Sequence, residues 1–134
     1  MTKKIILLAA LGMTTCSSQE FKNMDYKKTG IEFAQALADE DFTHAYSMLS
    51  EDLREKMSEE ELAQTYRDMI SYGGGPVNKI IPEDGYSDYP DMKPNELGGI
   101  YVSLVGNSFM EGILVFVCVE ENQARVRGID WGRP

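Results

Sequence analysis

The sequence is poor in cysteine and histidine. Only two cysteines, Cys16 and Cys118, and one histidine, His44, occur among the 134 residues. Two cysteines cannot build the set of disulfides that holds together many small secreted domains. A single histidine also excludes a zinc site built from several histidines. We therefore expect a domain that folds around an ordinary hydrophobic core and carries no metal ion and no cofactor.

Positive charge is also scarce. The chain has 22 acidic and 13 basic residues, which gives a formal net charge of -9, and Lys3 and Lys4 belong to a short segment at the N-terminus. No cluster of lysine or arginine offsets the negative charge elsewhere. Such a surface repels the phosphates of nucleic acids. We expect no nucleic acid partner.

The one sustained apolar run of the N-terminal region covers residues 5–13, directly after the two lysines. Nine residues are too few to cross a bilayer of about 30 Å as a helix. A basic start, a short apolar stretch and the small residues that follow are typical of an export signal. The sequence therefore predicts a signal peptide at residues 1–15 and a mature protein outside the cytoplasm.

Cys16 follows this segment directly. The segment resembles a bacterial lipoprotein signal, in which a cysteine after the apolar stretch is lipidated, for example with palmitate, and becomes the mature N-terminus. The resemblance implies an anchor at Cys16 in a bacterial membrane of the cell envelope, followed by a polar tether at residues 16–28. The alternative is an ordinary secretory signal that is cleaved near this point and leaves a periplasmic or secreted protein.

Residues 29–134 read as one domain that begins with helices. Thr29 with Glu32, and Ser58 with Glu61, have the spacing of capping boxes, and Asp41 is a suitable N-cap. The glycines and proline at 73–76 forbid continuation of the last helix. Apolar residues recur at helical spacing after each start. We expect helices at residues 29–38, 41–50 with a further turn to 53, and 58–72.

Beyond residue 76 the apolar pattern becomes that of strands. Four strands are predicted, at residues 77–81, 100–105, 111–120 and 123–131. Turn residues join the last three into an antiparallel meander. Residues 113–119 are apolar at every position, so helices should cover one face and a loop, a partner or a second copy the other. The sequence thus predicts an α+β fold.

The spacing of the helical half carries a resemblance to a known family. The pattern is followed by the glycine-rich break and the meander, and its positions are Ala34, Leu37, Asp41, Phe42, Ala45, Tyr46, Leu49, Ser50 and Leu53. This order resembles the nuclear transport factor 2-like (cystatin-like α+β) superfamily, in particular its small bacterial lipoproteins. The resemblance implies a cone-shaped fold in which the N-terminal helices pack on the concave face of a curved antiparallel sheet. Members of the family use the pocket inside the cone for catalysis, for ligand binding or only as core, and many form dimers through the outer sheet face.

Three residues are candidates for catalysis of the isomerase or dehydratase type. Such an enzyme needs a carboxylate base and a tyrosine or protonated acid that stabilises an oxyanion. Asp130, Tyr46 and Tyr66 would have to supply them. The competing interpretation, which we favour, places both tyrosines in the core and the aspartate at a strand end.

A long connection at residues 82–97 contains two further candidates, Tyr86 and Tyr89. Loops of this length in small domains are often functional. Tyrosine supplies a large contact area with few rotatable bonds, which suits protein recognition. We expect these two residues to contact a partner.

The last strand carries a basic stripe on an acidic chain, formed by Arg125, Arg127 and Arg133. In a regular strand these arginines share one face with Ile129 and Trp131. They either pair with glutamates of a neighbouring strand, such as Glu111 or Glu120, or hold an anion of a ligand. Trp131 is either a core residue or part of a ligand platform.

These features favour a non-catalytic, lipid-anchored cell-envelope protein that binds an unknown protein or small ligand. A small pocket enzyme that uses Asp130 and a tyrosine is the alternative. A third hypothesis is a structural role as a homodimer formed through the sheet.

Overall fold

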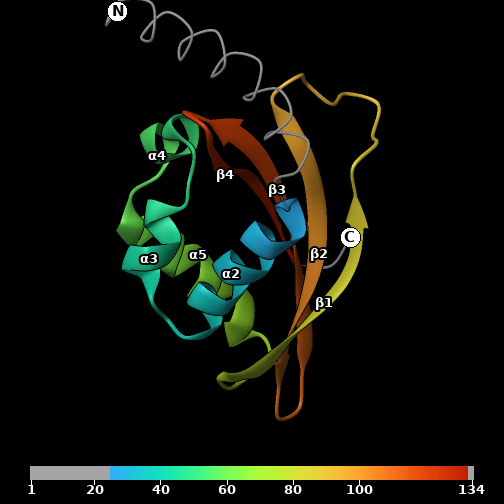
Figure 1. Ribbon diagram of the computed structural model, residues 1–134. Coiled ribbons are helices and arrows are strands. Elements are labelled where there is room, and N and C mark those ends of the chain that lie inside the picture. The colour runs from blue at the N-terminus through green and yellow to red at the C-terminus, as the bar shows by residue number, and fades with distance from the viewer. Residues whose placement is uncertain (1–24, 133–134) are drawn as a thin grey trace, which may run out of the picture.

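Within residues 25–132, four helices precede four strands. The computed structural model describes residues 25–132 (Figure 1). Its elements are α2 (Tyr26–Ala38), α3 (Phe42–Ser47), α4 (Glu51–Lys56), α5 (Glu59–Ser71), β1 (Val77–Tyr86), β2 (Glu96–Gly106), β3 (Met110–Glu120) and β4 (Gln123–Trp131). The predicted α+β class is confirmed. The expected signal peptide, the lipidation site Cys16 and Arg133 lie outside the described residues.

The first helix begins earlier than the sequence suggested. Asp25 caps α2, and its side chain accepts hydrogen bonds from the backbone N–H groups of Lys27 and Lys28. The predicted start at Thr29 is wrong, and the end of the expected tether at residues 16–28 is helical. Aspartate is as good an N-cap as threonine. At Asp25 its carboxylate accepts hydrogen bonds from two backbone N–H groups of the first turn. Among residues 25–132 no helix has both the length and the apolar composition that a membrane span requires.

The helix predicted at residues 41–50 ends at Ser47, and the further turn predicted to residue 53 is a separate helix, α4. Ser50 caps α4 through a hydrogen bond from Leu53 N–H to its hydroxyl. The residues just before it pair with β4, where Ser50 N–H donates to the Val126 carbonyl and Val126 N–H donates to the Met48 carbonyl. This short pairing interrupts the helix. The starts at Asp41 and Ser58 are confirmed, and Ser58 forms a complete capping box with Glu61.

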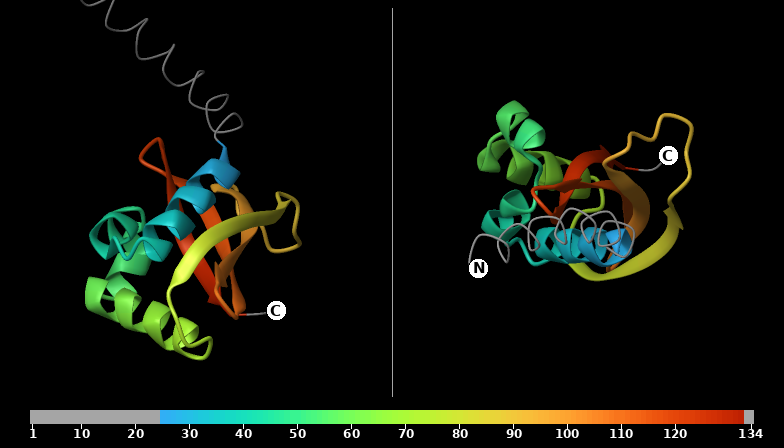
Figure 2. Two further views of the ribbon diagram at one scale, coloured as in Figure 1. Left: turned by 90° about the horizontal axis from the view of Figure 1, so that it is seen from below. Right: turned by 45° about the horizontal axis from the view of Figure 1, so that its top comes forward.

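The strands form one antiparallel sheet in the order β1-β2-β3-β4. The sheet bends around α2, which contacts all four strands, and the remaining helices lie on the same side (Figure 2). β1 continues to Tyr86 and β2 begins at Glu96, so the loop predicted at residues 82–97 shrinks to residues 87–95. The prediction missed this extension because an irregularity between Pro82 and Gly85 breaks the alternation of side chains.

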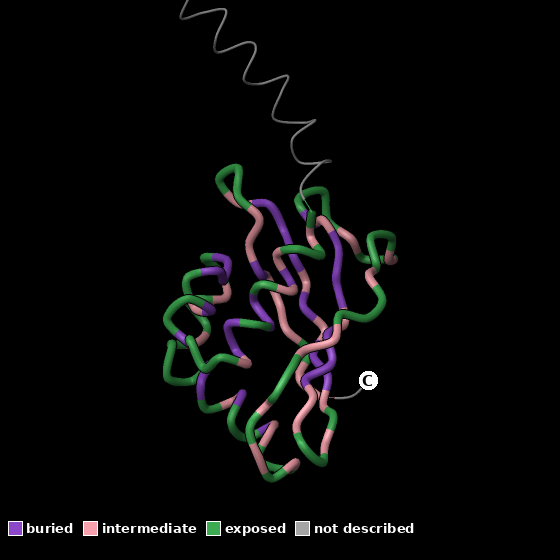
Figure 3. Tube along the Cα trace, turned by 60° about the horizontal axis from the view of Figure 1, so that its bottom comes forward, coloured by how far each residue is buried: buried purple, intermediate pink, exposed green. Residues whose placement is uncertain are grey.

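Aliphatic side chains fill the space between α2 and the sheet, on what we call the inner face. Phe33 and Leu37 of α2 are fully buried there against strand residues that are at most 1% exposed. Figure 3 shows the buried, intermediate and exposed segments along the chain trace. These strand residues are Ile100, Val102, Leu104, Ile113, Val115, Val117 and Val126. Gly30 lets α2 approach closely, because a Cβ at this position would overlap the side chain of Ile100. The inner face is therefore core.

Two β-bulges lie on either side of the same point of β3. Leu97 is the extra residue of β2, between the pairs Glu96–Cys118 and Gly98–Val117. Arg127 is the extra residue of β4, which shifts the pairing between Phe116 and Val117. A bulge changes which residues share a face of the sheet.

The bulge in β4 overturns the predicted basic stripe. Beyond it, Ile129 and Trp131 pair with inner-face residues of β3 and pack against the core. Before it, Arg125 pairs with Cys118, which belongs to the opposite, outer face. Arg125 and Arg127 therefore do not share a face with Ile129 and Trp131. The prediction failed because it assumed a regular strand.

Candidate functional site

The three residues predicted for catalysis have different environments and do not form one site. Tyr66 is 1% exposed in α5 and packs edge-to-face against Phe42, with 5.7 Å between ring centroids. Burial, reinforced by Glu40 and Asp39, raises the pKa of Tyr66 to about 12.

Tyr46 has a structural contact of its own. Its hydroxyl lies 3.0 Å from the carbonyl oxygens of both Arg54 and Met57 and so fixes α3 to the end of α4. Asp130 is exposed on the outer face, opposite Leu114. No pocket described for residues 25–132 is lined by Asp130 together with either tyrosine. A structural role in the helical half thus describes Tyr46 and Tyr66 better than a catalytic role.

A buried ion pair lies on the outer face, where the two bulges meet. The side chain of Glu96 is 3% exposed, and its Oε1 lies 2.7 Å from Nε of Arg127. The N–H of Arg127 does not point along this line, so the contact is an ion pair without a well-aligned hydrogen bond. The other carboxylate oxygen of Glu96 accepts a hydrogen bond of 3.1 Å from Lys93 N–H. The remaining ion pairs among residues 25–132 join exposed side chains.

Arg125 and Arg127 have partners other than the predicted Glu120. Glu96 lies two strands away from Arg127 and came from the segment that the sequence assigned to a loop. Arg125 donates to the Ser47 carbonyl and to the Gln123 side chain. Glu120 accepts hydrogen bonds from Glu51 N–H at the start of α4.

An aromatic cluster adjoins the ion pair. The Phe116 ring lies against Gly99, where a Cβ would be 3.0 Å from it. Tyr89 packs edge-on against this ring at 6.0 Å, and the Arg127 guanidinium stacks 4.6 Å from its centroid. The Tyr89 hydroxyl is buried next to Arg127 and Glu96 and forms no well-aligned hydrogen bond. Burial raises the pKa of Tyr89, and the nearby Arg127 lowers it in part.

Two of the five predicted binding residues, Tyr89 and Arg127, therefore come together, and the other three do not. Tyr86 is 50% exposed at the end of β1. Trp131 packs against the core from the inner face. Arg125 is engaged with the end of α3.

A polar hollow opens above the ion pair. It has a volume of about 380 Å³ and lies between α4, the end of the 87–95 loop and the outer side of β3 and β4. We call it the α4 hollow. Glu96 and Arg127 belong to its lining, and its other charged residues are Asp52, Lys56, Asp91, Lys93 and Glu120. Sequence reasoning missed it because its walls come from segments more than 70 residues apart.

Cys118 also lines the α4 hollow and is 3% exposed. Burial, with a smaller effect of Glu120, raises the pKa of its thiol to about 11. A thiol with this pKa is protonated at neutral pH and is a poor nucleophile. Cys118 therefore gives the hollow no reactive thiol at neutral pH.

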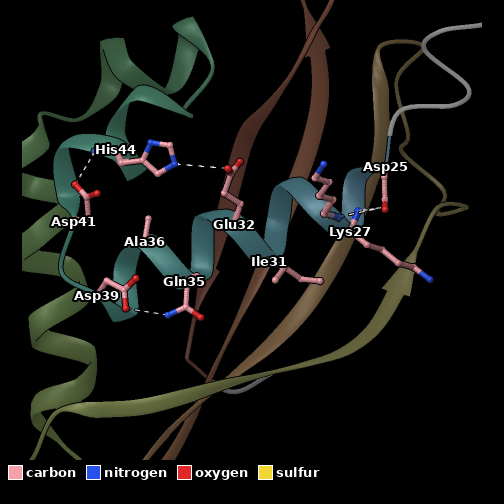
Figure 4. Close-up of a pocket in the computed structure, with 10 residues that line it drawn as sticks. Asp25, Lys27, Ile31, Glu32, Gln35, Ala36, Asp39, Asp41 and His44 are labelled. Atoms are coloured by element: carbon pink, nitrogen blue, oxygen red, sulfur yellow. Dashed lines mark hydrogen bonds and ion pairs between the residues drawn. The ribbon is translucent and has the colours of Figure 1, made fainter.

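A second, more open groove runs along the solvent side of α2. It has a volume of about 740 Å³, and Ile31, Glu32 and His44 contribute to its lining (Figure 4). Its side chains are mostly exposed, and His44 Nε2 lies 3.9 Å from the Glu32 carboxylate. This groove contains no buried charged group, so we regard the α4 hollow as the better candidate site.

Metal ligation has no obvious location in this part of the chain. Within residues 25–132, no three histidine, cysteine, aspartate or glutamate side chains are grouped closely enough to hold an ion.

Comparison of this protein with protein-family models, with curated proteins and with solved structures finds no match.

Proposed function

We propose that this protein is a non-catalytic binding protein whose ligand occupies the α4 hollow. The observation that carries the proposal is the buried Glu96–Arg127 pair, held at the hollow by two adjacent bulges. Bulges often re-aim side chains next to functional sites. Here they bring two charged residues from non-neighbouring strands into contact beneath a cavity.

Stability alone is a poor reason for this arrangement. Removing two charges from water costs several kcal/mol per ion, and well-packed apolar residues often serve at least as well. The Arg127 side chain remains 35% exposed, so the ion pair is not sealed from solvent on the arginine side. A binding role explains why the hollow is lined by the Glu96–Arg127 ion pair, which packing does not require.

The proposal includes the location that the N-terminal sequence suggests. An export signal at residues 1–15 and a lipid at Cys16 would hold the domain in the bacterial cell envelope. Radiolabelled palmitate that is incorporated by the natural chain and lost in Cys16→Ser would support the anchor. Unlabelled natural protein recovered in a soluble fraction would favour a secreted or periplasmic form instead.

We further propose that the domain belongs to the nuclear transport factor 2-like group with its cone-shaped fold. Helices that precede an antiparallel sheet bent around α2 support this assignment. In such a cone the usual pocket would lie between α2 and the sheet. In this protein that space is filled by Phe33 and Leu37, which is consistent with binding on the outer side.

A homodimer is the second candidate. Part of the outer face has no helix over it, and Tyr101, Leu114 and Phe116 are only partly buried there. A second copy could cover these side chains. Light scattering over a range of concentrations tests this idea, since a dimer weakened by Leu114→Glu supports it and a constant monomer excludes it.

The binding proposal is tested by NMR titration of the ¹⁵N-labelled protein with sets of small polar compounds. We expect shift changes in the amides of Lys93, Asn95 and Cys118, which line the hollow. Lys56→Gln should weaken the interaction, whereas Lys79→Gln, on the exposed surface of β1, is the matched control. Changes confined to the α2 groove, or no changes with any compound, would contradict the proposal.

A further inference from the structure

We infer that the ligand of the α4 hollow carries both a carboxylate and an ammonium group, as free amino acids and short peptides do. This inference rests on the proposed binding function and specifies its ligand class. The inference follows from the charged side chains that line the hollow, because some of them form an ion pair within the protein and others do not.

Arg127 has the geometry to receive the carboxylate. Its Nε lies 2.7 Å from Oε1 of Glu96, and its side chain remains 35% exposed. The Phe116 ring supports the guanidinium plane at 4.6 Å. A planar guanidinium with two open N–H donors binds a carboxylate in a bidentate manner, which a lysine cannot reproduce.

Two lysines add positive charge next to Arg127. Lys56 comes from the last turn of α4 and Lys93 from the 87–95 loop, and both line the hollow. Neither forms an ion pair with any of residues 25–132. A carboxylate bound at Arg127 therefore has further cations within the same cavity.

Carboxylates of the hollow argue against a ligand that is only an anion. Asp52 and Asp91 line it and form no ion pair within the described part of the chain. Together with Glu96 and Glu120 they outnumber the three cations by one. A sulfate or phosphate would be repelled by this set, whereas an ammonium group on the same ligand would find partners in Asp52 or Asp91.

The size of the hollow fits a small member of this class. Its volume of about 380 Å³ lies near the lower end of the range of roughly 300 to 1,000 Å³ that is usual for ligand pockets. Leu53 and Cys118 provide apolar lining for a short side chain. An amino acid or a peptide of a few residues is therefore a better match than a long chain.

Calorimetric titration of the purified protein tests the inference with a set of tripeptides Ala-X-Ala in three forms: with free ends, N-acetylated, and C-amidated. We expect the free peptides to bind and each capped form to bind at least about tenfold more weakly, because each cap removes one charge-assisted contact. Arg127→Lys should weaken the free peptides by a similar factor, since it keeps the charge and loses the fork. Lys79→Gln is the control and should bind as the natural chain does.

Folding of Arg127→Lys is verified by circular dichroism, and Lys56→Gln replaces it if the variant does not fold. Equal binding of free and capped peptides would overturn the inference. So would the absence of peptide binding while another polar compound shifts the amides of the hollow, a result that leaves the proposed binding function intact. If no compound shifts these amides, both proposals fail.

Discussion

The two faces of the sheet differ in composition although they belong to the same strands. On the inner face, residues such as Val102, Ile113 and Val115 are fully buried and purely aliphatic. On the outer face, glycines, aromatic rings and the Glu96–Arg127 pair lie side by side. The inner face contains what a stable core needs, and the outer face contains features that stability does not demand. This difference is the main reason for placing function on the outer face.

Substitution of adjacent residues of β3 tests this difference most strongly. Ile113 is fully buried on the inner face, whereas Leu114 is partly exposed on the outer face. We expect Ile113→Ala to lower the free energy of unfolding by about 3 to 4 kcal/mol, and Leu114→Ala by about 1 kcal/mol. Urea denaturation of both variants gives the comparison. Equal losses would show that the outer face is as tightly packed as the inner one.

The ion pair should give the next largest effect. Arg127→Met leaves the Glu96 carboxylate buried without its partner, and we expect a loss of about 2 to 3 kcal/mol in the free energy of unfolding. Combining it with Glu96→Leu should recover most of this loss, because no buried charge remains. Arg125→Met, which removes exposed hydrogen bonds, is the control and should cost less than about 1 kcal/mol. A double variant no more stable than Arg127→Met would argue against a desolvated carboxylate.

The dependence of stability on alkaline pH should also differ between a group in the core and a group on the outer face. The pKa of Tyr66, in the core, is raised from 10.0 to about 12, so the neutral phenol favours folding below pH 10 and this contribution disappears as the pH rises through 12. We expect a loss of about 2 kcal/mol over this interval. Tyr66→Phe should remove it.

Cys118, at the hollow, has a thiol pKa raised from 9.0 to about 11. Its contribution should therefore disappear at lower pH, between 9 and 11, and should be absent in Cys118→Ala. Unfolding by urea at several pH values between 8 and 12 distinguishes the two groups. Identical pH profiles of the Tyr66→Phe and Cys118→Ala variants would contradict the assignment.

The smallest expected effect concerns the glycines of the outer face. A Cβ at Gly112 would overlap the Tyr101 ring, so Gly112→Ala should cost about 1 kcal/mol while the ring turns away. In a Tyr101→Ala background the same substitution should be neutral or slightly stabilising, because alanine is better than glycine in a strand. Gly75→Ala, with no atom near the new Cβ, is a control. An unchanged cost in the Tyr101→Ala background would exclude this contact as the cause.

Local signals made most of the fold predictable. The capping box at Ser58 and the N-cap at Asp41 depend on residues three positions apart, and the structure has both. The meander followed from alternation and turn residues. The bulges at Leu97 and Arg127 could not be predicted in this way, because they arise from fitting three strands to one another.

The candidate site was predictable only in part for the same reason. Tyr89 and Arg127 were recognised by residue type, from the partner-binding capacity of tyrosine and arginine. Glu96 was not, since nothing in the sequence near it distinguishes a buried glutamate from a solvated one. Its burial depends on Arg127, which lies 31 positions later in the chain, and on the bulges that bring the two together.

The edges of the sheet limit how copies of this protein can associate. Along β4, the pairing of Leu49 with Val126 occupies part of the open edge. Along β1, Pro82 has no N–H to offer and two irregularities interrupt the ladder. Neither border presents an unbroken row of hydrogen-bonding groups, so growth of the sheet by addition of a neighbouring strand is disfavoured. Association of copies through their sheet edges is therefore disfavoured relative to association through a sheet face or the helices.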